Sequence, residues 1–200
     1  RVPFATAMDA PAPPPNGTVE RVIAASNDDA EEAPTSVHLT STDLELVVDG
    51  TVTQVVGLRF QNLLIPAGSF ISSAYVQFTT DEAWSTPTQL TIAGQASDNA
   101  PAFVATANNI SSRPRTTATV AWAPAAWTIL NEAGANQRTS DLRAVIQEIV
   151  NRSGWASGNA LVLILTGTGH RTAEAFEGLA TAAPLLHIET GGSPPTHTPP

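Results

Sequence analysis

Three acidic clusters stand out in a chain that otherwise carries few charges. Four of the five residues from 28 to 32 are acidic, and acidic pairs recur at 43/45 and 81/82. Carboxylates a few Å apart repel by about 1 kcal/mol per pair in bulk water, and by more near a protein surface. Such groups suit calcium, which takes about six to eight oxygen ligands. The candidate ligands are Asp28, Asp29, Glu31, Glu32, Asp43, Glu45, Asp81 and Glu82.

The alternative is an acidic face that is only solvated. The spacing is not that of an EF-hand, because the required glycine and distal glutamate are absent. Alternate residues of a strand point to opposite faces, so we do not expect all eight acids to bind one ion.

Other chemistry has little support in the sequence. The chain has no cysteine, which excludes disulfides and thiolate chemistry. The four histidines, at 38, 170, 187 and 197, lie far apart and in no ligand or triad motif. A glycosidase needs only two nearby carboxylates, and any acidic surface offers such pairs. We therefore expect a protein that is not an enzyme.

Composition excludes two classes of partner. The net charge is -9, and all nine basic residues are arginine. Nucleic-acid binding needs a basic stripe, which this chain lacks. No apolar run is long enough to span a bilayer, so we expect no membrane span.

The N-terminal segment has the pattern of a strand set apart from the domain. In residues 1–10 the larger side chains alternate, and the Pro-rich segment 11–18 is a stiff spacer. A frayed terminus is one interpretation. The other is a donor strand that docks into another copy of the chain and so builds a head-to-tail fibre. The side chains that would dock are Val2, Phe4, Thr6 and Met8.

Alternating apolar residues between turn signals predict about ten short strands and one helix. This order is typical of an all-β fold, a β-sandwich or jelly roll. Apolar residues at helical spacing predict an amphipathic helix over 140–151, with Thr139 or Ser140 as its cap. The continuous apolar run 160–165 predicts a central strand covered on both faces. The predicted strands are 19–25, 36–40, 44–48, 53–63, 70–79, 88–96, 118–122, 160–165, 172–177 and 185–189.

Some residues could contact or carry glycans. Tyr75 and Trp84 are candidate aromatic contacts for a sugar ring, although tryptophans more often cap a core. The acceptor pattern for N-glycosylation occurs three times, and threonines among prolines in the tail suit O-glycosylation. The candidate positions are Asn16, Asn109, Asn151, Thr196 and Thr198.

Several segments together resemble a secreted bacterial module. The sequence is similar to the DNRLRE type and, more distantly, to calcium-bearing jelly-roll carbohydrate-binding modules. The resemblance implies a jelly roll, stabilisation by calcium, no catalysis and an extracellular location. It covers roughly residues 19–190, and the two ends resemble the linking segments of head-to-tail extracellular fibrils. The segments that carry it are 28–32, 42–46, 56–60, 65–68, 74–78, 110–115 and 163–169.

The sequence thus predicts four parts: a donor strand (1–10), a Pro-rich linker (11–18), a jelly-roll domain (19–190) and a Pro/Thr-rich tail (191–200). The leading hypothesis is an extracellular structural subunit, stabilised by calcium, whose partners are other copies of itself. The alternative is a carbohydrate-binding or adhesive module of a larger secreted protein.

Overall fold

The computed structural model describes residues 16–191, and in this range the chain forms fourteen β-strands with only short helices. The prediction of an all-β sandwich is confirmed, whereas the jelly-roll assignment stays a prediction. The donor-strand residues Val2, Phe4, Thr6 and Met8 lie outside the described residues, as do Thr196 and Thr198.

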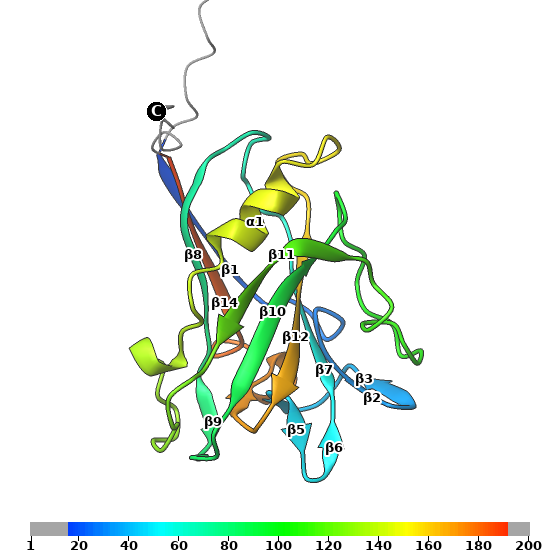
Figure 1. Ribbon diagram of the computed structural model, residues 1–200, viewed down its shortest axis with the longest axis vertical. Helices are drawn as coiled ribbons and strands as arrows, with labels where there is room; N and C mark the ends of the chain where they lie inside the picture. The colour runs from blue at the N-terminus through cyan, green and yellow to red at the C-terminus, as the bar shows by residue number, and fades with distance from the viewer. Residues whose placement is uncertain (1–15, 192–200) are drawn as a thin grey trace, which may run out of the picture.

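The larger layer is a six-stranded antiparallel sheet, sheet B (Figure 1). Its central strand β12 pairs with β10 on one side and β7 on the other. In spatial order the strands are β11 (Arg115–Trp122), β10 (Gln89–Gln95), β12 (Leu161–Thr168), β7 (Val55–Phe60), β2 (Asp29–Ala33) and β3 (Ser36–His38).

The opposite layer consists of two three-stranded sheets. Sheet A has the order β1 (Gly17–Val22), β14 (Leu185–Thr190) and β8 (Ile71–Gln77). Sheet C has the order β4 (Asp43–Glu45), β13 (Thr172–Glu174) and β9 (Thr80–Glu82). Because β9 follows β8 after two residues, sheet C lies at one end of sheet A, where Figure 1 shows β9 below β8. A hairpin of β5 (Val48–Asp49) and β6 (Val52–Thr53) projects from the same end, turning at Gly50, whose φ of 54° favours glycine.

The main core fills the space between these layers. Strand β12 shows why the run 160–165 contains no polar residue: Leu161, Leu163 and Leu165 face the main core, and Val162 and Ile164 belong to a second cluster. The prediction that this strand is covered on both faces is confirmed.

The second cluster lies under the loop of residues 97–114, which covers the outer face of sheet B. Phe103 and Ile110 of this loop pack with Val162 and Ile164. Gly57 on β7 makes room for the loop, because a Cβ there would come within 2.5 Å of the Phe103 ring. The loop is thus part of the folded structure.

Helix α1 (Arg143–Val150) closes the core at the end opposite sheet C (Figure 1). Its buried face, with Val145 and Ile149, packs against β10 at Gly94, where a Cβ would come within 2.6 Å of Ile149. The helix is shorter than predicted because the segment before it, residues 139–142, is hydrogen-bonded to β8. Thr139 and Asp141 accept hydrogen bonds from the backbone of β8, so the predicted cap at Thr139 or Ser140 does not form.

Other boundaries also differ from the sequence prediction. The acidic run forms strand β2 in place of a loop, which its pairing with β7 and β3 explains. Strand β13 ends at Glu174, and a short helix α2 (Phe176–Leu179) follows it. Strand β1 begins at Gly17, two residues before the predicted domain boundary at Val19.

Candidate metal centre

Sheet C brings together acidic side chains that are far apart in the sequence. Carboxylate oxygens of Asp43 on β4 and of Asp81 and Glu82 on β9 all lie within 4.8 Å of one another. Glu174 on β13 is the register partner of Asp43, and its side chain is hydrogen-bonded to that of Asp81. We call these four residues the sheet C acidic group.

The sheet C acidic group is under electrostatic strain. Burial raises the pKa of Asp81, and the charges of Asp43 and Glu82 raise it further. Burial also raises the pKa of Glu174, which faces the charges of Asp81 and Asp43. Like charges opposed across two strands destabilise a sheet, so a bound cation would relieve this repulsion.

The donor set of this group fits calcium. All of its side chains offer carboxylate oxygen, the ligand that hard cations prefer, and none offers nitrogen or sulfur. Backbone carbonyls and water would supply the rest of the roughly six to eight oxygen ligands that calcium takes. Three of the eight predicted ligands, Asp43, Asp81 and Glu82, are therefore brought together.

Asp28 makes a different set of contacts. Its carboxylate accepts a hydrogen bond of 2.6 Å from the Arg59 guanidinium and another from the Gln61 amide. Arg59 also donates to the carbonyl of Ala100 in the outer loop. Asp28 is fully buried, so this pair ties the start of β2 to β7 and to the outer loop.

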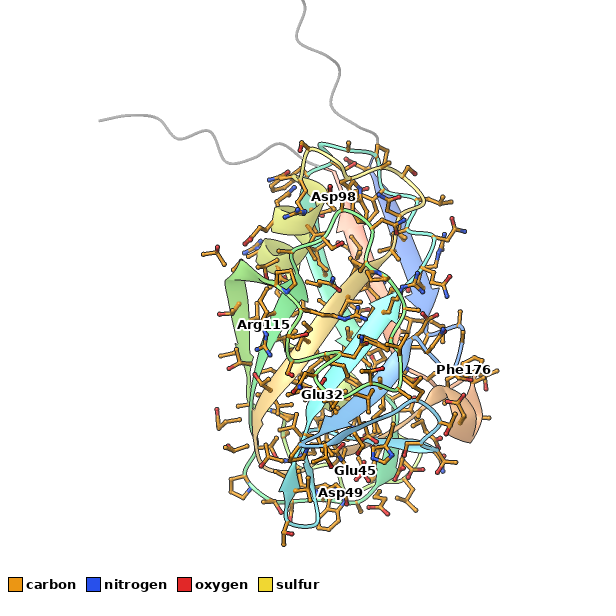
Figure 2. The ribbon with its side chains drawn as sticks, turned by 90° about the vertical axis from the view of Figure 1, so that its right-hand side faces the viewer. Glu32, Glu45, Asp49, Asp98, Arg115 and Phe176 are labelled. Atoms are coloured by element: carbon orange, nitrogen blue, oxygen red, sulfur yellow. The ribbon has the colours of Figure 1, made fainter. Side chains whose placement is uncertain are left out.

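Glu32 and Asp29 hold backbone segments. The Glu32 carboxylate accepts hydrogen bonds from the N–H groups of Ile110 and Ser111, at 2.6 and 3.1 Å, and so fastens the outer loop. Asp29 accepts one from Phe176 N at the start of α2. Burial, opposed by this hydrogen bond, raises the pKa of Asp29 to about 7. Figure 2 shows Glu32 on the face of sheet B, away from Glu45 and Asp49 at the end of the molecule.

Glu31 and Glu45 form a separate pair of carboxyl groups. The Glu31 carboxyl accepts a hydrogen bond of 2.6 Å from Glu45 N. Burial raises the pKa of Glu31 far above its usual range, and a hydrogen bond with the Glu45 carboxyl raises it further. A cavity of about 290 Å³ next to the pair is also lined by His38 and Asp49.

The glycan-contact candidates lie in two different environments. The Tyr75 ring stacks on His187 at 4.7 Å and carries the Arg138 guanidinium at 4.7 Å, so two protein side chains already contact it. Trp84 is 37% exposed and lines a cavity of about 530 Å³.

The glycosylation candidates also differ. Asn109 uses its side-chain oxygen to accept hydrogen bonds from Val104 N and Arg113, inside the outer loop. Asn151 accepts one from Gln147 at the end of α1. Asn16 is exposed, directly before β1.

Sequence reasoning missed two members of this end of the molecule. Glu174 is the single acid of the short strand β13 and lies far along the chain from Asp43, so only strand pairing brings them together. Thr172 also escaped notice, although its hydroxyl donates to Glu82 at 3.3 Å. The alternation of Thr172, Ala173 and Glu174 was the available signal.

Comparisons with known proteins leave the sequence resemblance as a hypothesis. No protein-family model matches the chain, and no relative is found among curated proteins. In residues 16–191 no helix is long and apolar enough to cross a membrane.

Proposed function

We propose that this protein is a non-catalytic structural subunit of an extracellular fibre. Residues 2–8 of one copy pair with strand β1 of the next copy, and calcium bound by the sheet C acidic group stabilises each subunit. The observation that carries the proposal is the outer edge of β1, which no other strand of the described residues covers.

Strand β1 has backbone groups directed away from its own sheet. Ile23 N donates to Pro184 O on the β14 side, so alternation along the strand directs the N–H and C=O groups of Thr18, Glu20 and Val22 outward. Among residues 16–191, the Arg21 guanidinium donates a hydrogen bond of 2.7 Å to the outward carbonyl of Glu20. An extended segment could pair with this edge by β-strand addition.

An apolar groove runs beside this edge. It has a volume of about 340 Å³ and is lined by β1 residues, including Val19, together with Leu64 and Pro66. The Leu64 side chain is 56% exposed. Alternating side chains of an incoming strand, such as Val2, Phe4 and Met8, could bury themselves there and contribute about 1.5–3 kcal/mol each.

Other long edges are covered by the chain itself, which makes β1 distinctive. The segment around Thr139 hydrogen-bonds along the outer edge of β8, at Ala74, Val76 and Phe78. On β11, the Glu148 carboxylate accepts the N–H groups of Thr117 and Ala118. Proteins usually protect exposed edges in such ways because an open edge pairs with other chains.

A proline at position 20 tests the edge directly. Glu20→Pro removes an outward N–H but none of the hydrogen bonds to β14. Glu20→Ala is the matched control, because it also loses the ion pair with His187 yet keeps the N–H. We expect filaments from the wild-type full chain and from Glu20→Ala, and monomers from Glu20→Pro, by negative-stain microscopy and sedimentation velocity.

The groove is tested by a pair of exposed leucines. Leu64→Ser should weaken assembly, whereas Leu179→Ser, at a side chain of similar exposure outside the groove, should not. Filaments of unchanged yield from both Glu20→Pro and Leu64→Ser would refute docking at β1. A wild-type full chain that stays monomeric with calcium would refute the fibre itself.

A further inference from the structure

The cavity beside Trp84 lies at the end of the sandwich formed by sheet C, next to the sheet C acidic group, with which it shares Glu82. Its volume is about 530 Å³, and its walls include Glu45, Asp49, Glu82, Trp84 and His170. Figure 2 shows Glu45 and Asp49 at this end, and Figure 1 places β9 there, opposite the start of β1. The cavity is therefore distant from the groove beside the first residues of β1.

Trp84 is a rigid wall of this cavity although it is partly exposed. Its backbone exchanges two hydrogen bonds with Trp127, of 2.7 and 2.9 Å. Its indole N–H donates to Glu82 at 3.0 Å, and its ring lies 4.1 Å from that of His170. A ligand that stacks on this indole would not have to order it, which lowers the entropy loss on binding.

The hydrogen bonds behind the wall also fix His170. The Thr172 hydroxyl lies 3.3 Å from the Glu82 carboxylate and 2.9 Å from His170 Nε2, so it joins these two side chains by hydrogen bonds. His170, Thr172 and Glu82 thus form a connected network that holds the wall in place.

Charge defines the kind of ligand. Three carboxyl groups, those of Glu45, Asp49 and Glu82, line the cavity, and among the described residues no arginine side chain does. The nearby Arg171 is only 2% exposed, and its guanidinium is bound to backbone carbonyls in the interior. Such a cavity repels anions, whereas an indole face with carboxylates around it attracts an organic cation.

We propose that this cavity binds a guanidinium group, such as an arginine side chain presented by a protein. A planar guanidinium can stack on the Trp84 indole while its N–H groups donate to Asp49 and Glu45. A lysine ammonium has no planar face for the stacking contact and cannot form two parallel hydrogen bonds. The proposal does not depend on the fibre, because it concerns a different end of the molecule.

The test uses the full chain and N-acetyl-arginine amide as the probe. The matched control is N-acetyl-citrulline amide, which has nearly the same shape but no charge. Indole N–H resonances of the four tryptophans report binding, and Trp84→Phe identifies the Trp84 signal. We expect the arginine probe, and not the citrulline one, to shift this signal, with binding that weakens as salt screens the charges.

Variants separate the cavity from general electrostatics. Asp49→Asn keeps an acceptor oxygen but loses the charge, so it should weaken binding of the arginine probe about fivefold. Glu189→Gln, at an exposed acid on β14, should leave it unchanged. Equal binding of the two probes, or equal effects of the two variants, would overturn the proposal. It would also be overturned if a neutral disaccharide shifted the Trp84 signal and the arginine probe did not.

Discussion

Replacing Asp43 by asparagine should have opposite effects with and without calcium. In the absence of the ion, the variant removes one charge from a group of four carboxyl side chains. Charges that lie within 4.8 Å of one another repel by about 1 kcal/mol per pair at the dielectric constant of water. With neighbouring acids partly screened by salt, we expect Asp43→Asn to stabilise the calcium-free protein by about 1–2 kcal/mol.

With calcium the order should reverse. A site present only in the folded state stabilises it by about 2.7 kcal/mol at a free ion concentration of one hundred times the dissociation constant. Asp43→Asn loses one charged ligand and therefore much of this gain. Each kcal/mol shifts the melting temperature by about 2–4 °C in a domain of this size. Melting curves in chelator and in calcium, for both proteins, give all four values needed.

Whether Asp43→Asn raises or lowers the melting temperature in each condition decides between a calcium site and an ordinary structural role for Asp43. Glu189→Gln serves as the control, since it removes an exposed charge far from sheet C. A wild-type melting temperature that is identical in chelator and calcium would refute the metal centre. A variant less stable than wild type in both conditions would refute the repulsion argument, because Asp43 would then act as an ordinary structural side chain.

Two further predictions concern buried charged groups. Arg171 donates hydrogen bonds to the carbonyls of Thr86, Pro124 and Ala125, so Arg171→Met should destabilise the fold by about 3–5 kcal/mol in urea unfolding. The exposed Arg115→Met is its control, and a loss below about 1 kcal/mol would contradict this prediction. Asp29 has its pKa raised from 3.8 to about 7. Between these pH values, Asp29 carries a proton in the folded state and has lost it in the unfolded chain. The free energy of unfolding therefore falls as pH rises through this window. Asp29→Asn should therefore gain stability relative to wild type as pH rises from about 4 to about 7, by up to about 4 kcal/mol, and a difference independent of pH would contradict the assignment.

Much of the fold could be read from periodicity, because burial on one face leaves an alternating pattern. Strand β8 and the two-sided β12 are examples, and both were predicted close to their observed bounds. The strand β2 could not be predicted in this way. Its sequence, from Asp29 to Ala33, carries three acids, and its burial results from an outer loop that packs on the sheet from elsewhere in the chain.

For the candidate site, the sequence predicted which types of residue would bind a metal, but not which of those residues lie together. The acids at 43, 81 and 82 were recognised as ligand types, but which of them meet depends on the register of β4, β13 and β9. The densest acidic run, residues 28–32, was the least informative about the metal site. Along β2 the side chains of neighbouring residues point to opposite faces, and Asp28, directly before the strand, contacts a different partner from Asp29 and Glu32.

The acidic residues therefore divide into two physical roles. Those of the first run are neutralised or hydrogen-bonded inside the protein: Arg59 pairs with Asp28, and Glu32 accepts two backbone N–H groups. Those of sheet C face mainly one another. Buried charges are stable only when they are compensated, and the first run has its compensation within the chain. For the sheet C acidic group we propose a partner from outside, so calcium should change stability through Asp43 and its neighbours and leave the outer loop untouched.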